Sequence, residues 1–477
     1  MSRDLAIQFA YLAASILLVG GLSGLTNPKA ARRGLFALEL GMGVAVVATL
    51  LRREIVTYEF IALGVLVGGL LGTIISLRIP MTKMPERIAF SHAFGGLAVT
   101  LVGVVEVLHR QHGPPMNVLQ AAAVGAEIML GAVTFTGSVM AFGKLQGFVP
   151  GRPVTFPGQN LFNGLIIVTL VGLLAFVVAR PDQTTAHFAL LGLALLLGVT
   201  LVLPIGGADM PVVICLLNAY AGLAASATGF ALKNNVLIIC GALDGGSGLI
   251  LGMLMAKAMN RSFWNVLFGA FGSLPGAAAQ APVSGRAPNE ASLDDALEVL
   301  AAAQTVIVVP GYGMAVSQAQ HALNELATML EQAGCDVRYA IHPVAGRMPG
   351  HMNVLLAEAN VPYEKLYDLD AINDDFGTAD VALVVGANDV VNPAAKEDPA
   401  SPIFGMPILA ADRARSCIVL KRSLNPGFAG IENQLFVKEN TMLVLGDAKK
   451  TLRELGQALR ATAEDSAVRS KPKAAAA

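Results

Sequence analysis

The stretch TVIVVPGYGMAVSQ, residues 305–318, predicts the fold of the second half of the chain. Its β-branched start, 305–309, predicts a buried parallel strand that ends at Pro310, which has no N–H for a ladder. A turn containing Gly311 and Gly313 comes next, and an alanine-rich helical pattern follows it. Strand, glycine turn and helix in this order are typical of a dinucleotide-binding unit, in which turn N–H groups and the helix N-terminus hold a pyrophosphate.

The glycine motif is a weak signal by itself. In the pattern G-x-G-x-x-G the third glycine is replaced by Val316, which predicts a wider separation between helix and strand. A plain glycine turn is therefore the alternative to a nucleotide site, and the residues around the motif must decide between the two.

Outward from this stretch, the sequence alternates between strand and helix patterns. Further strands are predicted at 336–341, 381–385, 408–410, 416–420 and 442–445, with helical stretches between several of them. Upstream, Ser292 begins a short helix that ends at Ala302, and Asp295 completes a capping-box pattern. The fold class predicted for this half is an α/β Rossmann-like domain with a doubly wound parallel sheet.

The ends of two predicted strands indicate which dinucleotide binds. An NAD site places an acid about 20 residues past the glycines, but the strand 336–341 runs into residues 342–347, which contain none. The strand 416–420 is followed by Lys-Arg-Ser at 421–423, and two cations with a hydroxyl suit the 2′-phosphate of NADP. A solvated basic edge is the alternative. Residues 386–389 also follow a buried strand, where ligands bind in open α/β sheets.

The first half of the chain has the composition of a membrane domain. Of the 477 residues 14% are charged, against roughly 25% in an average soluble protein, and the deficit lies in the first 260 or so. Apolar spans near the ~20 residues needed to cross a bilayer occur at 5–25, 35–51, 58–77, 88–108, 118–142, 161–179, 187–206, 211–231 and 236–256. The sequence therefore predicts an α-helical membrane bundle of about nine transmembrane helices.

The predicted organisation has four parts. These are a transmembrane domain (1–261), a Gly/Ala/Pro/Ser-rich linker (262–289), the α/β domain (290–465) and a disordered tail (466–477). Lysine and arginine are more frequent in the loops on the side of the α/β domain, which predicts that this domain is cytoplasmic and the N-terminus periplasmic. Four cysteines without a C-x-x-C predict buried thiols on a reducing side, with no metal site and no disulfide framework.

Five polar residues lie within the apolar spans or at their edges. His92 is in the first third of the fourth span, Glu127 is in the fifth, Asn218 in the eighth and Asp244 in the ninth, and Asp209 lies in the turn before the eighth. An ionisable group in hydrocarbon costs ~2.5–3.5 kcal/mol on insertion scales, so a functional role is the default interpretation. A histidine that titrates near neutrality suits a proton relay.

Each of these residues also has a structural interpretation. His92 can be an inter-helix hydrogen-bond partner, and Asn218, which cannot carry a net proton, can join helices or belong to a water chain. Asp209 can be an N-cap. Glu127 and Asp244 can pair with polar neighbours without any function.

Several functional classes are disfavoured. The net charge of −1 argues against nucleic acid as a partner. The sequence has no Ser/His/Asp series, no Walker lysine and no second glycine fingerprint. The α/β domain is therefore predicted to bind one dinucleotide, and the second party to any hydride transfer must come from elsewhere.

Longer motifs carry a resemblance to a known family. They are PGYGMAVSQAQ (310–320), IHPVAGRMPGHMNVLLAEA (341–359), INDDF (372–376), GANDVVNPAA (386–395), KRSLNPGFAG (421–430), GDAK (446–449), SHAFGG (91–96), GAVTFTGS (131–138) and GGADMPV (206–212). Over nearly its full length the chain resembles the β subunit of the proton-translocating NAD(P) transhydrogenase. Asp244 falls in none of these motifs and receives no role from the resemblance.

The resemblance implies that the α/β domain binds NADP(H) in a reversed orientation and that residues after Ser423 form a lid. The implied cofactor-binding residues are Gly311, Tyr312, Gly313, Val344, Ala345, Gly346, Arg347, Met348, Pro349, Gly386, Ala387, Asn388, Asp389, Val390, Gly405, Met406, Lys421, Arg422, Ser423, Leu424, Asn425, Pro426, Gly427, Phe428, Asp447 and Ala448. Phe428 stands where some members are expected to carry a tyrosine. Asp389 is implied as a titratable group that links the NADP(H) state to protonation.

For the membrane half, the resemblance implies a proton path. His92 and Asn218 match path positions, Asp209 lies near the cytoplasmic end, and Glu127 is a further candidate. A partner α subunit would carry NAD(H), two αβ units would form a dimer embedded in membrane lipid, and the location would be the bacterial inner membrane.

The leading hypothesis is therefore a redox-driven proton pump in which NADH on the partner reduces NADP⁺ on this chain. The alternative is a proton or ion transporter gated by an NADP(H)-sensing domain. A third class, a membrane-anchored NADP-dependent dehydrogenase, is disfavoured by the surplus of spans and the missing acid/base pair.

Overall fold

A computed structural model describes most of the chain. The described residues are 3–25, 30–52, 57–80, 83–110, 116–151, 153–260, 263, 287–346, 350–401, 403–427 and 429–470. The chain divides into two compact units, which are described separately. The predicted linker lies mostly outside the described residues.

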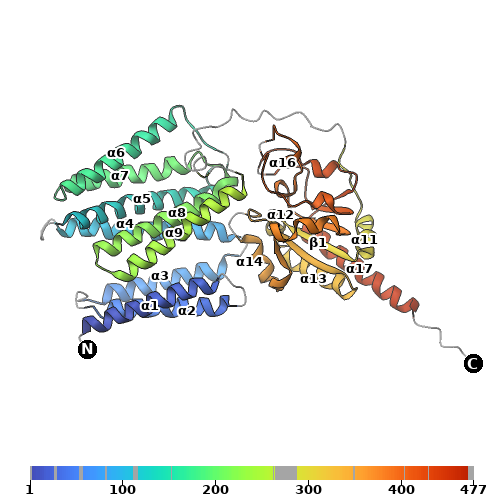
Figure 1. The fold of residues 1–477 in the computed structure, drawn as a ribbon, viewed down its shortest axis with the longest axis horizontal. Coiled ribbons are helices and arrows are strands. Elements are labelled where there is room, and N and C mark those ends of the chain that lie inside the picture. The colour runs from blue at the N-terminus through green and yellow to red at the C-terminus, as the bar shows by residue number, and fades with distance from the viewer. Residues whose placement is uncertain are drawn as a thin grey trace, which may run out of the picture. The chain divides into compact units, whose positions relative to one another are not determined.

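Among the described residues, nine helices are long and apolar enough to cross a membrane (Figure 1). They are α1 (Arg3–Leu25), α2 (Ala31–Leu50), α3 (Glu59–Arg78), α4 (Met84–Arg110), α5 (Val118–Gln146), α6 (Gln159–Ala179), α7 (Thr184–Val202), α8 (Met210–Ala231) and α9 (Asn235–Ala258). Each coincides with one predicted span. The prediction of a multi-pass helical membrane domain is confirmed.

Small residues allow the membrane helices to approach closely. A Cβ atom on Gly96 of α4 would lie 2.8 Å from the Phe135 nitrogen of α5, and one on Gly222 of α8 would lie 2.3 Å from the Gly245 nitrogen of α9. Such contacts between backbones favour a packed helical bundle. They also fix which turns of α4, α5, α8 and α9 lie at the same level.

Helix α7 ends at Val202, four residues before its predicted limit, for an identifiable reason. Pro204 has no N–H, so the carbonyl of Thr200 loses its helical donor. The side-chain amides of Gln159 and Asn163 on α6 donate to this carbonyl instead, at 3.1 and 3.3 Å. The freed backbone group is thus satisfied inside the bundle.

The second unit contains a six-stranded parallel sheet in the order β3-β2-β1-β4-β5-β6. The strands are β1 (Thr305–Pro310), β2 (Asp336–Ile341), β3 (Leu366–Asp368), β4 (Val381–Val385), β5 (Ser416–Lys421) and β6 (Thr441–Leu445). The longer helices are α11 (Leu293–Ala302), α12 (Tyr312–Ser317), α13 (Gln320–Gln332), α14 (His351–Glu358) and α17 (Ala448–Ser470). This is the strand order of a doubly wound dinucleotide-binding fold, as predicted, and its order reverses between β1 and β4.

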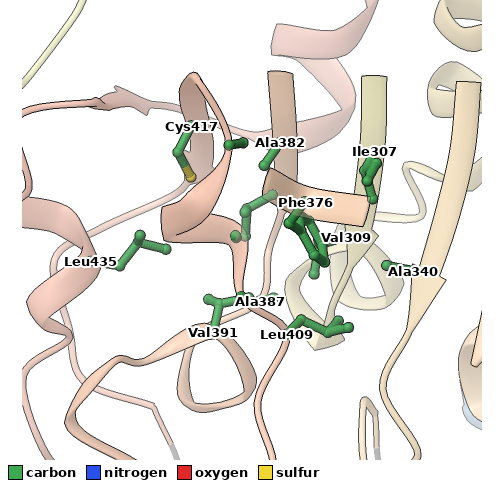
Figure 2. Packing of buried hydrophobic residues seen from close by; sticks show 14 of the residues in the cluster. Ile307, Val309, Ala340, Phe376, Ala382, Ala387, Val391, Leu409, Cys417 and Leu435 are labelled. Atoms are coloured by element: carbon green, nitrogen blue, oxygen red, sulfur yellow. The ribbon is translucent and has the colours of Figure 1, made fainter. Parts of the chain in front are cut away.

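Short irregular segments cover one face of the sheet. Ile307 and Val309 of β1 belong to a buried cluster that continues through β4 and β5. Phe376, which has no exposed surface, lies in this cluster beside Val309 (Figure 2). On α13, Leu323, Leu326 and Leu330 are buried at helical spacing, as expected for a helix packed on a sheet.

Three details of the sequence prediction are wrong. The segment 408–410 is a buried loop, because its backbone bonds the Asn373 side chain instead of a neighbouring strand. β3 was not predicted, since three residues give no periodic pattern. The predicted long helix after the glycine turn is two helices, broken at Gln318, which has a left-handed φ of 52°.

The limits of the α/β domain also differ slightly from the prediction. The N–H of Leu443 donates to the carbonyl of Asn289 at 2.8 Å, so Asn289 already lies along β6. The capping box of Ser292 and Asp295 at the start of α11 is confirmed. Helix α17 continues to Ser470, five residues into the segment predicted as a tail, and 471–477 lie outside the described residues.

Candidate functional site

The glycine turn after β1 is joined to the loop after β4. The N–H of Gly311 donates to Val385 at 2.9 Å, and that of Gly313 donates to Gly386 at 2.8 Å. A Cβ on Gly311 would lie only 2.3 Å from the Cα of Ala387, so the close approach requires glycine. Both N–H groups that the sequence pattern assigns to a pyrophosphate are thus engaged with the β4 loop.

The Lys-Arg-Ser segment at the end of β5 presents two cations in different environments. The Lys421 ammonium donates to the carbonyl of Asn425 and lies 4.8 Å from the centre of the Phe436 ring. Burial lowers the pKa of Lys421, and the Asp389 carboxylate opposes that shift. Arg422 is exposed and makes no hydrogen bond or ion pair within the described part of the chain. One cation therefore shapes the loop, and the other is available to a ligand.

Gly427 and Ala429, which belong to the segment 424–430 that is here called the lid segment, lie against the Asp389 side chain. Asp389 Oδ2 accepts a hydrogen bond from the N–H of Ala429 at 2.9 Å. A Cβ on Gly427 would lie 2.5 Å from Asp389 Oδ1, so the lid backbone passes directly against the carboxylate. Phe428, at the centre of the lid segment, lies outside the described residues.

Two asparagine side chains form hydrogen bonds between the residues that follow the lid segment and the β4 loop. Asn433 Nδ2 donates to the carbonyl of Asn388 at 2.9 Å. Asn392 is fully buried and donates to the carbonyl of Glu432 at 3.0 Å. Sequence reasoning assigned no role to Asn392 or Asn433, because one asparagine in an irregular segment carries no spacing signal. These bonds hold the downstream end of the lid segment against the β4 loop.

The residues that follow β2 lie at the same carboxyl edge of the sheet. His342 Nδ1 accepts from the N–H of Val344 at 3.2 Å, so its proton lies on Nε2, which donates to Pro407 at 2.8 Å. Burial lowers the pKa of His342 to about 4. Gly346, with a φ of 109°, packs on the His351 ring. Arg347, Met348 and Pro349 lie outside the described residues.

The remaining described residues that were predicted to bind the cofactor lie near the carboxyl edge of the sheet as well. The N–H of Gly446 donates to the carbonyl of Lys421 at 2.9 Å, which brings Asp447 and the start of α17 beside the end of β5. The N–H of Gly405 donates to Ala395, and Met406 packs with Ala395 under the lid residue Ala429. The described members of the predicted set therefore follow the carboxyl ends of β1, β2, β4, β5 and β6 or pack under the lid segment, as a ligand site in this fold requires.

In the membrane unit, a hydrogen bond and an electrostatic interaction link polar residues of three helices. Asn218 Nδ2 of α8 donates to Asp244 Oδ1 of α9 at 3.1 Å. The Asp244 carboxylate acts electrostatically on the half-buried His92 imidazole of α4. Asp244, which receives no role from the family resemblance, thus interacts with two residues predicted for the proton path.

Ser138 lies at the same level of the bundle. Gly96 of α4 contacts Phe135 of α5, and Gly137 of α5 contacts Leu217 of α8, so one turn of each helix meets there. The Ser138 hydroxyl is fully buried and has no hydrogen-bond partner among the described residues. Sequence reasoning missed this residue, because a serine in a membrane helix is usually only a small packing residue.

Glu127 is separate from this group. It is fully buried, neither carboxyl oxygen has a hydrogen-bond partner within the described residues, and it packs against Gly103 of α4. The nearby Thr228 hydroxyl donates to Ala224 at 3.1 Å. From Glu127 to Ser138 along α5 is about 16 Å at ~1.5 Å per residue, so Glu127 occupies another depth of the bundle.

Asp209 ends the short 3-10 helix η2 (Gly207–Asp209) that precedes α8. Asp209 takes the N-cap position of α8, but its side chain makes no capping hydrogen bond to this helix. The turn is held instead by the backbone, where the N–H of Gly207 donates to Gly151 at 2.9 Å.

These features define a multi-pass membrane protein with a dinucleotide-type α/β domain. A family model described as NAD(P) transhydrogenase beta subunit matches residues 7–458. The chain is 50% identical to NAD(P) transhydrogenase subunit beta of Rhodospirillum rubrum over 459 aligned residues. The alignment covers 94% of this chain and 98% of that relative. A second Rhodospirillum rubrum sequence of the same description gives the same values.

The chain belongs to the NAD(P) transhydrogenase beta subunit family, and it is therefore a subunit of an enzyme. The resemblance predicted from the motifs is confirmed.

Proposed function

We propose that this chain binds NADP(H) on its α/β domain and exchanges hydride with NAD(H) held by a partner α subunit, while a proton crosses the membrane bundle. The overall reaction is NADH + NADP⁺ + H⁺(outside) → NAD⁺ + NADPH + H⁺(inside). The observation that carries the proposal is the meeting of Lys421, Asp389 and the lid segment at the carboxyl edge of the sheet.

The residues at this edge fit a 2′-phosphorylated dinucleotide. Arg422 is exposed and unpaired within the described residues, and the Ser423 hydroxyl is half-buried next to it, so both can bind a phosphate. The bound nicotinamide supplies the hydride chemistry. The chain's own contribution is to hold the cofactor under the lid segment, orient it towards a partner and exclude water.

The group around Asn218 supports the second half of the proposal. The Asp244 carboxylate acts electrostatically on His92, and Asn218 donates a hydrogen bond to that carboxylate. The proton route would connect Glu127 at one depth with Asp209 near the other end of α8. We place the α/β domain and Asp209 on the cytoplasmic side of a bacterial inner membrane, and the N-terminus on the periplasmic side. Two αβ units would form the dimer.

The proposal is tested with the β chain and its α partner in sealed proteoliposomes. Hydride transfer between the two nucleotides should acidify or alkalinise the lumen according to its direction, and His92→Ala should abolish the pH change while NADP(H) remains bound. Binding of NADP(H) without any hydride transfer would indicate an NADP(H)-gated transporter instead. Undiminished pumping by His92→Ala would remove His92 from the path.

A further inference from the structure

Asp244 is a carboxylate in the middle of a membrane helix. It lies ten residues inside α9 (Asn235–Ala258), and apolar residues and glycines flank it. A carboxylate at such a depth costs ~2.5–3.5 kcal/mol on insertion scales unless it finds partners. Neither the motifs nor the proposed function uses this residue, so its partners indicate what it does.

The α8–α9 contact is built so that Asn218 reaches Asp244. A Cβ on Gly248 would lie 3.1 Å from Asn218 Nδ2, and one on Gly245 would contact Leu223 of α8. These glycines bring the helices close enough for Asn218 Nδ2 to donate to Asp244 Oδ1 at 3.1 Å. The hydroxyl of Ser247 donates to the backbone carbonyl of Asp244, so it does not compete for the carboxylate.

Asp244 is the charged group that acts electrostatically on His92, whereas Glu86 and Arg87 lie more than one turn before His92 on α4. Within one turn of the Gly96, Gly137 and Gly248 contacts, the other titratable side chains on α4, α5, α7, α8 and α9 are the uncharged Cys215 and Tyr220. The nearest cations are engaged elsewhere: Lys144 donates to the carbonyls of Leu203 and Ile205, and Arg87 donates to the Ser76 hydroxyl. Glu127 and Asp209 lie at other depths.

From this geometry we propose that Asp244 is a positioning residue of the proton path, the counter-ion that stabilises His92 in its protonated form. The inference rests on the proposed function. When a proton reaches His92, the imidazolium and the carboxylate carry opposite charges, and their attraction favours the protonated imidazole. Asn218 stays neutral and holds the carboxylate in place, which gives this amide a role that does not require it to carry a proton.

The test separates the effect of the charge at position 244 from the effect of the side chain's size. It uses proteoliposomes that contain the full β chain and its α partner. Asp244→Asn keeps the shape and an oxygen that can accept from Asn218, but it removes the charge. We expect a fall of at least tenfold in proton-coupled turnover at neutral pH and a shift of the pH optimum to lower pH, because His92 protonates less readily without a carboxylate beside it. Asp244→Glu should restore the wild-type optimum in large part.

Asp182→Asn, in the loop between α6 and α7, removes the same charge outside the bundle and should leave the pH profile unchanged. NADP(H) affinity of all variants should equal that of the wild type. Should Asp244→Asn not accumulate, Asp244→Ala replaces it, since the side chain is exposed on this chain and its removal leaves no buried cavity.

A wild-type pH profile and turnover in Asp244→Asn, with pumping lost in His92→Ala, would overturn the role of Asp244 and leave the proposed function intact. Full pumping in both variants would overturn the proton path itself.

Discussion

The carboxylate of Asp389 accepts a hydrogen bond at 2.9 Å from the backbone N–H of Ala429, which lies 40 residues later in the sequence. The contact joins the loop after β4 to the lid segment, and Gly427 packs on the same carboxylate. A carboxylate that accepts a backbone N–H makes a charge-assisted bond, which is stronger than a neutral one. A charge-assisted bond of this kind links the β4 loop to the lid segment at Ala429.

Asp389→Ala should accelerate NADP(H) release. Loss of a hydrogen bond to a charged group costs about 1.5–3 kcal/mol, which corresponds to a dissociation rate about 10 to 100 times higher if the whole loss falls on the closed lid. Stopped-flow fluorescence of NADPH displaced by NADP⁺ measures this rate. Asp398→Ala is the matched control, because Asp398 Oδ1 also accepts a backbone N–H, from Ala400 at 2.9 Å, outside the lid. Equal rates in the two variants would contradict the role of Asp389.

Lys421→Ala combined with Arg422→Ala should weaken NADP(H) far more than NAD(H), because only the phosphorylated dinucleotide needs two cations. Titration calorimetry of the purified β subunit with each nucleotide provides the comparison. The two single variants should differ. Lys421→Ala also removes the hydrogen bond from Lys421 to the Asn425 carbonyl of the lid segment, whereas Arg422→Ala should lower only the affinity for NADP(H), because Arg422 is exposed. Arg453→Ala, exposed on α17, is the control. Equal losses for both nucleotides would exclude a 2′-phosphate site.

His342 should make the α/β domain less stable in mild acid. Its pKa is about 4 in the folded protein against 6.5 as the ordinary value, because burial disfavours the cation. The stabilising effect of a neutral His342 is thus complete above pH 6.5 and declines as the pH falls towards 4, by up to about 3 kcal/mol.

Thermal midpoints of wild type and His342→Gln, measured from pH 7 to pH 4.5, test this dependence. The glutamine variant should be less stable at pH 7 and should lose less stability on acidification. Parallel pH curves for the two proteins would show that His342 does not cause the acid sensitivity.

Gly311→Ala should disrupt the contact between the glycine turn after β1 and the loop after β4. Its new methyl group would meet the Ala387 backbone at 2.3 Å, and two main chains cannot separate without breaking the Gly311–Val385 hydrogen bond. We expect a loss of about 1–3 kcal/mol in stability and weaker NADP(H) binding. Gly377→Ala is the control, because no atom lies within 4 Å of the position that its methyl group would take and its φ is not positive. Thermal midpoints that agree for both variants would contradict the close-packing argument.

Local patterns in the sequence predicted most of the fold. Long apolar spans and the β-branched runs of β1, β4 and β5 specify their elements without tertiary help, and so does the Ser292 capping box. The break at Gln318 and the three-residue β3 depend on packing with distant segments, so no local pattern indicates them.

Sequence motifs predicted which residues belong to the candidate site, but not the contacts between them. The motifs identify Asp389, Lys421 and the lid segment, yet their mutual bonds join positions that lie far apart in sequence. The pairing of Asn218 with Asp244 depends on which faces of α8 and α9 meet, and one sequence does not specify that rotation. The N–H groups of the glycine turn are engaged by a neighbouring loop for the same reason.

The backbone bonds between the β1 turn and the end of β4 and its loop hold these segments together by their main chains. Under the proposed function, the nucleotide would then enter and leave by displacement of the lid segment and not by separation of the two loops. A single short segment would therefore control both retention and exchange of the nucleotide, and wherever release limits turnover, a change that slows release would slow the catalytic cycle by the same factor.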